Sequence, residues 1–211
     1  MYFFLMLLIP CVLGFYCIKS KDKAVVPVCV FGAVLSIIVC ICTALFSFLH
    51  RIPEYSFSSN FSYFAMREYI FPLVLLYAFY FIVSKDEISF KIKAFFPVSA
   101  SFFAFYMPYL IIVSNQSVFS FYELFVKPLI FVSMLILIEK SLSLLYKFAV
   151  EKKTLGIIIV STVLAFVLFI PPFLNTLWIT NWLSGIFVIF SILYILFAVF
   201  IGFLSILKED E

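Results

Sequence analysis

Apolar stretches long enough to cross a membrane alternate along this chain with short gaps that carry most of its basic residues. The chain is 66% hydrophobic and 12% charged, with a mean hydropathy of +1.26. A soluble domain cannot bury so much apolar surface, whereas a membrane helix needs about 20 predominantly apolar residues. The sequence therefore predicts an all-α polytopic membrane protein whose principal partner is the lipid bilayer.

The apolar stretches predict seven transmembrane helices, at residues 2–18, 24–49, 69–83, 94–113, 128–150, 155–174 and 182–207. These spans and their short connections use nearly all of the 211 residues. We therefore expect residues 1–211 to form a single helical bundle without a soluble domain. The first stretch has neither the basic start nor the small-residue cleavage site of a signal peptide, so we expect it to be retained as a helix.

The basic residues predict the orientation of the bundle. Eleven of the fourteen Lys and Arg residues lie in alternate gaps, at 19–23, 85–93, 140–153 and 208, and only Arg51, Arg67 and Lys127 lie in the other gaps. Short loops rich in Lys and Arg stay in the cytoplasm. This pattern predicts an outside N-terminus, a cytoplasmic C-terminus and, by parity, seven spans. We expect the cell membrane as the location, specifically a bacterial inner membrane.

Each of the three basic residues expected outside has a carboxylate nearby, which gives the pairs Arg51 and Glu54, Arg67 and Glu68, and Lys127 and Glu123. They are either exposed ion pairs that contribute little or parts of an external vestibule for a polar or zwitterionic ligand. His50 belongs to the same candidate vestibule. The segment 50–68 that holds it is predicted to be an interfacial helix or a re-entrant cap.

The apolar part of the fifth span is too short to cross the bilayer, so this helix must bring charged residues into the membrane. Its apolar part, residues 128–138, covers only about 16 Å of helix. If the span begins at Pro128, Glu139 and Lys140 lie in the inner half of the bilayer; if it begins near Val118, Glu123 and Lys127 are submerged instead. Intramembrane charges often mark function. On a helix, Glu139 shares a face with Ser143 and Tyr146. We therefore expect a candidate ligand or ion pathway made of Glu139, Lys140, Ser143 and Tyr146. In the alternative, Lys140 reaches the headgroups and Glu139 lies at the interface.

Proline and glycine predict how the helices begin, end and pack. Pro72 and Pro128 lie near predicted helix starts, where a missing N–H costs little. Pro171 and Pro172 are expected to end the sixth span. The chain has five glycines, 31 Phe and 12 Tyr, and no GxxxG, so we expect packing through aromatic side chains rather than through small residues.

No nucleotide, hydrolase or zinc motif occurs in the chain. We therefore expect no metal site, no cofactor and no nucleic-acid partner. The sequence favours a permease, transporter or channel-type subunit for a small solute or ion. Two alternatives remain: a seven-helix sensor or assembly module working with a separate membrane or cytoplasmic partner, and a membrane-embedded enzyme.

Overall fold

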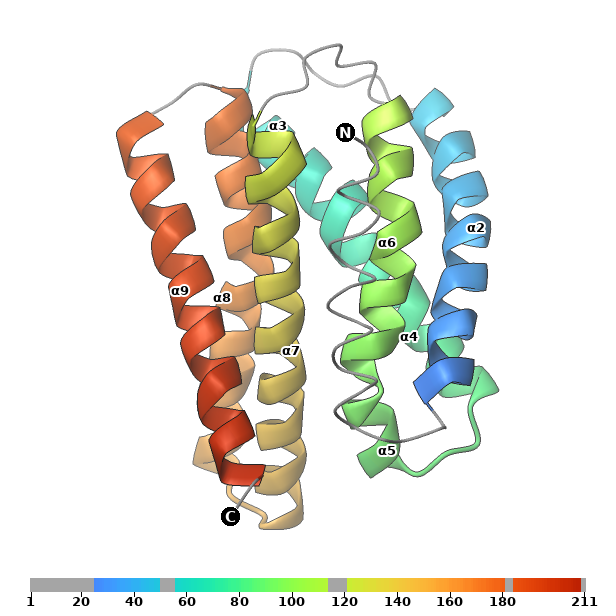
Figure 1. The fold of residues 1–211 in the computed structure, drawn as a ribbon, viewed down its shortest axis with the longest axis vertical. Helices are drawn as coiled ribbons and strands as arrows, with labels where there is room; N and C mark the ends of the chain where they lie inside the picture. Colours follow the sequence, from blue (N-terminus) through green and yellow to red (C-terminus); the bar gives the residue numbers. More distant parts are fainter. Residues whose placement is uncertain (1–24, 50–55, 114–120, 181–183, 210–211) are drawn as a thin grey trace.

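The described part of the chain is entirely helical apart from short turns. A computed structural model describes residues 25–49, 56–113, 121–180 and 184–209, and no strand occurs among them (Figure 1). Eight α-helices are described: α2 (Val25–Leu49), α3 (Phe57–Phe64), α4 (Phe71–Val83), α5 (Ile88–Lys93), α6 (Phe95–Val113), α7 (Lys127–Val150), α8 (Thr154–Ile179) and α9 (Ser184–Glu209). Two π-helical turns, η1 (Ala65–Ile70) and η2 (Tyr122–Val126), directly precede α4 and α7. The prediction of an all-α protein is confirmed.

Among the described residues, five helices are long and apolar enough to cross a membrane: Val25–Leu45, Phe57–Val83, Lys127–Val150, Thr154–Ile179 and Gly185–Leu204. A shorter apolar helix covers Phe95–Leu110. Helices suit a bilayer because all their backbone hydrogen bonds are made within the segment. The described helices are compatible with an integral membrane protein, while the first predicted span, 2–18, lies outside the described residues.

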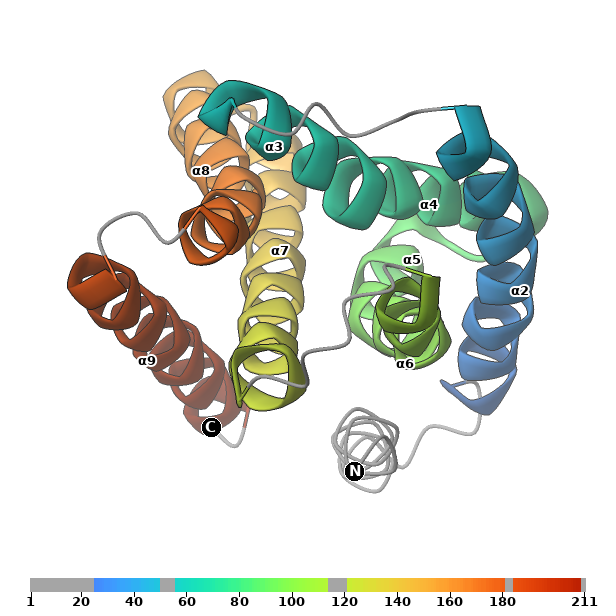
Figure 2. The ribbon, with the colours of Figure 1, turned by 90° about the horizontal axis from the view of Figure 1, so that it is seen from above.

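The helices form two groups that are joined by a third element (Figures 1 and 2). On one side α7 packs against α8 and α9, and on the other α2 packs along α6. The continuous helix α3–η1–α4 runs across both groups, since α3 and η1 contact α8 whereas α4 contacts α2 and α6. Its middle, which is η1, therefore lies where the two groups meet.

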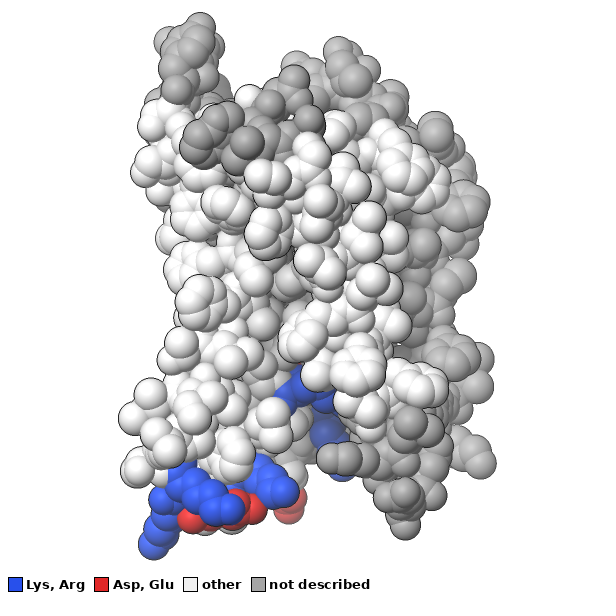
Figure 3. All heavy atoms as spheres, turned by 90° about the vertical axis from the view of Figure 1, so that its left-hand side faces the viewer, with Lys and Arg blue, Asp and Glu red and all other residues white. Residues whose placement is uncertain are grey.

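The surface divides into a long apolar side and a charged end. Large apolar side chains are exposed along α9, among them Ile189, Phe190, Leu193, Phe197 and Phe200. Such a continuous apolar face is a liability in water but is ordinary in lipid. On the face seen in Figure 3, the charged side chains gather at one end of the molecule. We call this end, which includes the turn Glu151–Lys153 between α7 and α8, the Lys-rich end.

The third helix begins much earlier than predicted. It starts at Phe57 rather than Tyr69 and continues without interruption to Val83. The prediction of an interfacial helix or a cap is therefore wrong for residues 57–68, because Arg67 and Glu68 lie within a membrane-length helix. Residues 50–55 lie outside the described part of the chain.

The fifth helix lies where it was predicted, since α7 covers Lys127–Val150, whereas the sixth helix differs from the prediction. Helical structure also precedes α7, because it runs from Phe121 through η2 into α7; the start of the alternative span, near Val118, lies outside the described residues. Pro171 and Pro172 do not end the sixth helix, because α8 continues past them to Ile179. Hydropathy underestimates the sixth helix, since polar residues near its end lower the average of a window without breaking the helix.

The core is aromatic, as expected, but one helix pair packs through small residues. Tyr69, Tyr106, Phe102, Phe103 and Phe131 are among the largest fully buried side chains. At the crossing of α2 and α6, however, a Cβ added to Gly32 would lie 2.3 Å from the Ser101 Oγ and 2.3 Å from the Val98 carbonyl oxygen. The prediction that close small-residue contacts are unimportant is wrong for this pair of helices.

Candidate functional site

Four polar side chains from three parts of the chain meet inside the bundle. The Lys127 Nζ lies 3.0 Å from the Glu68 Oε2. The Asn175 Nδ2 donates a hydrogen bond to the same oxygen at 3.0 Å, and the Tyr122 hydroxyl donates to the Asn175 Oδ1 at 3.3 Å. We call Glu68, Lys127, Asn175 and Tyr122 the buried polar cluster.

The cluster is almost completely enclosed by protein. The side chains of Lys127 and Glu68 are 7% and 9% exposed, and Asn175 and Tyr122 are also buried. Removing two charges from water carries a penalty of several kcal/mol per ion, which is offset only by good geometry and further hydrogen bonds. The contact from Asn175 supplies such a hydrogen bond. The prediction of exposed ion pairs is therefore wrong for Glu68 and Lys127, and the structure joins residues that the sequence had assigned to different pairs.

Prolines within the helices explain why the backbone is irregular here. Both π-helical turns end two residues before a proline: the Phe71 N–H bonds to the Met66 carbonyl ahead of Pro72, and the Lys127 N–H bonds to the Tyr122 carbonyl ahead of Pro128. A proline ring inside a helix clashes with the carbonyl four residues earlier. Widening the preceding turn from i→i+4 to i→i+5 bonding relieves that clash.

Tyrosine hydroxyls from neighbouring helices donate hydrogen bonds to backbone carbonyls that Pro72 and Pro171 leave without a helical donor. Pro72 has no N–H to continue the π-helical pattern onto the Arg67 carbonyl, and the Tyr106 hydroxyl of α6 donates to that oxygen at 2.7 Å. Pro171 likewise cannot bond to the Val167 carbonyl, and the Tyr194 hydroxyl of α9 donates to it at 3.2 Å. The turns before Pro72 and Pro171 are therefore each held by a specific contact between helices.

Aromatic rings lie on both sides of the cluster along α7. Before Lys127, the Tyr122 ring stacks on Trp178 with centroids 4.7 Å apart and meets Phe187 at 5.3 Å. After Lys127, the Phe131 ring stacks on Tyr69 at 4.4 Å. The polar groups thus lie between two aromatic layers, where charge interactions are stronger than in water.

A second set of buried charges lies closer to the Lys-rich end. Glu139 of α7 is 5% exposed, and its carboxylate is 3.5 Å from the Lys140 Nζ. On α5, which packs against α7, the buried Lys91 donates to the Phe81 carbonyl at 3.2 Å and lies over the Phe81 ring. Lys91 therefore caps the last turn of α4, where carbonyls lack helical partners.

The remaining predicted pathway residues do not continue inward from Glu139. The Ser143 hydroxyl donates to the backbone carbonyl of Glu139 at 3.0 Å rather than to its carboxylate. Ser143 and Tyr146 are both exposed on the helix surface. Of the four predicted pathway residues, the structure brings together only Glu139 and Lys140.

The predicted vestibule is only partly represented in the described chain. His50, Arg51 and Glu54 lie outside the described residues, as does the side chain of Glu123. Arg67 is half-buried, donates a hydrogen bond to the Tyr63 hydroxyl and lies over the Tyr63 ring. The structure thus assembles Glu68 and Lys127 with Asn175 and Tyr122, which the sequence did not single out.

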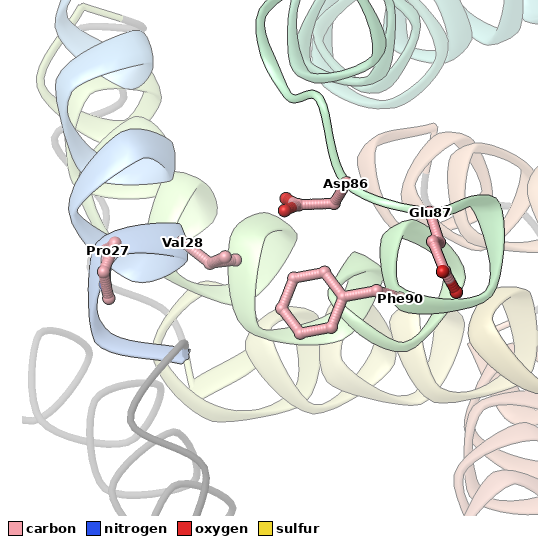
Figure 4. A pocket seen from close by; sticks show the side chains of 5 residues that line it. All are labelled: Pro27, Val28, Asp86, Glu87 and Phe90. Carbon is pink, nitrogen blue, oxygen red and sulfur yellow. The ribbon is translucent and has the colours of Figure 1, made fainter.

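A cavity of about 450 Å³ lies at the Lys-rich end, away from the cluster. Pro27, Val28, Asp86, Glu87 and Phe90 line it (Figure 4). The Asp86 carboxylate points toward Val28, whereas the Glu87 carboxylate points away from Val28. Within the described residues no group of three His, Cys, Asp or Glu side chains could hold a metal ion.

The Lys-rich end also provides a surface ion pair for comparison. The Lys153 Nζ lies 2.8 Å from the Glu151 Oε2, and both side chains are open to solvent. The hydrogen bond from Lys153 lowers the pKa of the Glu151 carboxyl. This pair has the same chemistry as Glu68 and Lys127 in very different surroundings.

The chain matches no family model, no curated protein and no solved structure. The site must therefore be assessed from its own geometry. A signal for Asn175 was present in the sequence, since it follows Pro171 and Pro172 within one helical turn. Glu68 and Lys127 also lie within four residues before a proline.

Proposed function

We propose that this chain is a permease-type transporter or transporter subunit and that its small solute or ion binds at the buried polar cluster. The observation that carries this proposal is the enclosed ion pair between Lys127 and Glu68, 3.0 Å apart. Ionisable groups inside a membrane bundle are rare and commonly mark substrate or ion pathways.

The backbone around the cluster supports the same function. Solute sites in secondary transporters are typically built where membrane helices are interrupted, and π-helical turns occur frequently at functional sites. Here η1 supplies Glu68, η2 supplies Tyr122, and Asn175 follows Pro171 and Pro172. Two π-helical turns and a proline-containing helix therefore supply the side chains of one cluster.

The proposed topology has seven spans, with the N-terminus outside and the C-terminus in the cytoplasm of a bacterial cell. Its support is the alternation of Lys-rich gaps along the sequence. In this orientation the buried polar cluster lies in the outer half of the membrane and Glu139 in the inner half. A transported cation or solute would then meet the Glu68 carboxylate on one side of the stacked Phe131 and Tyr69 rings and the Glu139 carboxylate on the other.

Flux measurements on the purified, reconstituted full chain test the proposal. Liposomes are loaded with a defined mixture of small metabolites, and the retained contents are measured by mass spectrometry. We expect at least one solute to leave faster than from protein-free liposomes, and Glu68→Gln or Lys127→Met to reduce that rate at least ~10-fold because either change removes one member of the enclosed ion pair.

The matched control is Lys153→Met, which removes an ion pair of the same type from the surface. It should leave the flux unchanged at equal reconstitution. If no solute moves faster than from empty liposomes, or if both cluster variants transport like the wild type, the proposal is wrong.

A further inference from the structure

We propose that the cavity at the Lys-rich end binds a small organic ammonium ion, one that carries an apolar body. The cavity lies between the start of α2 and the segment that joins α4 to α5, away from the buried polar cluster. This inference goes beyond the proposed function and does not depend on it, because it concerns different residues and requires no transport.

The size and the walls of the cavity suit a small molecule. Its volume of about 450 Å³ falls within the range of roughly 300–1,000 Å³ that is typical of ligand pockets. Pro27 and Val28 form an apolar wall, and the Phe90 ring extends toward Val28 from the opposite side (Figure 4). Val28 is buried and Phe90 is half-buried, so an apolar group that enters here is removed from water.

The charges that line the cavity favour a cation. The Asp86 carboxylate points toward Val28, next to the Phe90 ring, and accepts a hydrogen bond from the Ser84 hydroxyl. Within the described residues no basic side chain forms an ion pair with Asp86 or Glu87. An ammonium group beside Asp86 would gain a charge-assisted hydrogen bond and the attraction of an aromatic face.

The nearby basic residue of α5 does not supply this charge. The Lys91 ammonium donates to the Phe81 carbonyl at 3.2 Å and lies over the Phe81 ring. It therefore stabilises the end of α4 and leaves the Asp86 carboxylate to a ligand.

A buried tyrosine supplies a second polar contact beside Asp86. Tyr80, near the end of α4, is 3% exposed. Its hydroxyl lies near the Ser84 hydroxyl and the Asp86 carboxylate, but it makes no well-formed hydrogen bond in the described structure. A buried hydroxyl in this state carries a desolvation cost that a new donor offsets. A primary ammonium ion has several N–H donors, enough to reach Asp86 and Tyr80 together.

A metal ion or an anion fits the same cavity less well. Hard divalent cations need roughly six oxygen ligands, whereas the Glu87 carboxylate points away from the Asp86 side of the cavity. No group of three His, Cys, Asp or Glu side chains in the described part of the chain could hold a metal. An anion would meet the carboxylates without a cation between them.

Equilibrium binding to the purified full chain in dodecyl maltoside, an uncharged detergent, tests the inference. The probe is benzylammonium. Benzyl alcohol and benzoate are its neutral and anionic analogues, benzyltrimethylammonium is a cation without N–H donors, and Mg²⁺ is the metal control. We expect benzylammonium to bind saturably, with an affinity at least ~10-fold higher than that of benzyl alcohol, benzoate or Mg²⁺.

Variants identify the side chains that bind the ammonium group. Asp86→Asn should weaken benzylammonium binding at least ~10-fold, whereas Glu151→Gln, which removes an exposed carboxylate at the same end of the molecule, should leave it unchanged. Tyr80→Phe should weaken the binding of benzylammonium but not that of benzyltrimethylammonium, because only the first can donate an N–H to the hydroxyl. Its melting temperature without ligand should stay close to that of the wild type, since no well-formed hydrogen bond is lost.

A lipid headgroup and a free amine can both supply the ammonium group, and a competition experiment distinguishes them. If phosphatidylethanolamine in mixed micelles displaces benzylammonium, the site takes the headgroup; if it does not, the site takes a free amine. Either result supports an ammonium site.

Results with the wild type alone can overturn the inference. It is wrong if benzyl alcohol or benzoate binds as tightly as benzylammonium, if Mg²⁺ binds more tightly, or if benzylammonium does not bind saturably. Equal affinity of the wild type and Asp86→Asn would also contradict it. None of these measurements involves flux, so the transporter proposal is judged separately by the liposome experiment.

Discussion

The ion pair of Glu68 with Lys127 and that of Glu151 with Lys153 have the same chemistry and similar N–O distances, 3.0 Å and 2.8 Å. Their surroundings differ. The first pair is enclosed among helices and receives an additional hydrogen bond from Asn175, whereas the second lies in a surface turn. Screening by water makes a surface pair worth ~0 to 1 kcal/mol, whereas breaking a buried pair from one side costs about 3–5 kcal/mol.

We therefore expect the two pairs to behave differently in double-mutant cycles. Lys127→Met and Glu68→Gln should each lower the free energy of unfolding by ~3 kcal/mol, and the double variant should lose much less than the sum, because the two buried side chains contact each other directly. Lys153→Met and Glu151→Gln should each leave it nearly unchanged, because water screens this surface pair. Reversible unfolding in mixed micelles measures both cycles, and equal coupling in the two pairs would contradict the burial of the first.

Prolines shape the helices that carry the cluster. At Pro72 and at Pro171 the missing N–H leaves a carbonyl without its helical donor, and a side chain from another helix donates to it instead. Tyr106 does so for η1 and Tyr194 for α8. These tyrosines link the irregular turns to the rest of the bundle, so each turn is stable only in its tertiary context.

This interpretation predicts a specific rescue. Tyr106→Phe should cost ~1–3 kcal/mol, because the buried Arg67 carbonyl loses its donor. Pro72→Ala restores an N–H at the position that would complete the π-helical bond to that carbonyl, so Tyr106→Phe should cost less in the Pro72→Ala background. Tyr109→Phe is the control, because the Tyr109 hydroxyl is buried with no hydrogen-bond partner in the described structure and its removal should be neutral or stabilising. Melting temperatures in detergent measure both effects. If Tyr106→Phe lowers the melting temperature as much in the Pro72→Ala background as in the wild type, the role of Pro72 is wrong.

The crossing of α2 with α6 supports a second prediction about a helix pair. Gly32→Ala should destabilise the protein by ~1–3 kcal/mol, because the new methyl group would lie 2.3 Å from a backbone oxygen that cannot simply rotate away. Gly185→Ala, in α9, meets nothing within 4 Å and should be neutral or slightly stabilising, because alanine favours the helix. If the two variants melt at the same temperature, the close approach of α2 and α6 is wrong.

At the level of the whole molecule, the two helix groups meet along the crossing helix α3–η1–α4 (Figure 2). Glu68 comes from this crossing helix, whereas Lys127 and Asn175 come from α7 and α8. A change in the angle between the crossing helix and the α7–α8 pair would therefore open the ion pair. Such a movement of two bundles around a central site is the usual basis of alternating access.

The orientation of the whole bundle is open to direct test. In a cysteine-free background, Lys152→Cys should be labelled by an impermeant thiol reagent only after the cells are opened, whereas Asn115→Cys should be labelled on intact cells. An N-terminal epitope tag should be accessible from outside if seven spans are present. Labelling of both positions from the same side, or a cytoplasmic N-terminal tag, would refute this topology.

The membrane class, the helical fold and the approximate positions of α2, α6, α7 and α9 were accessible from the sequence, because run length and hydropathy are local properties of the chain. The full length of the third helix was not, because Arg67 and Glu68 resemble the end of a span until their buried surroundings are known. The pairing of Glu68 with Lys127, and with Asn175 107 residues away, depends on how whole helices rotate and cross. Side-chain packing and the π-helical turns set those rotations. The spacing of residues along the sequence determines neither the packing nor the π-helical turns.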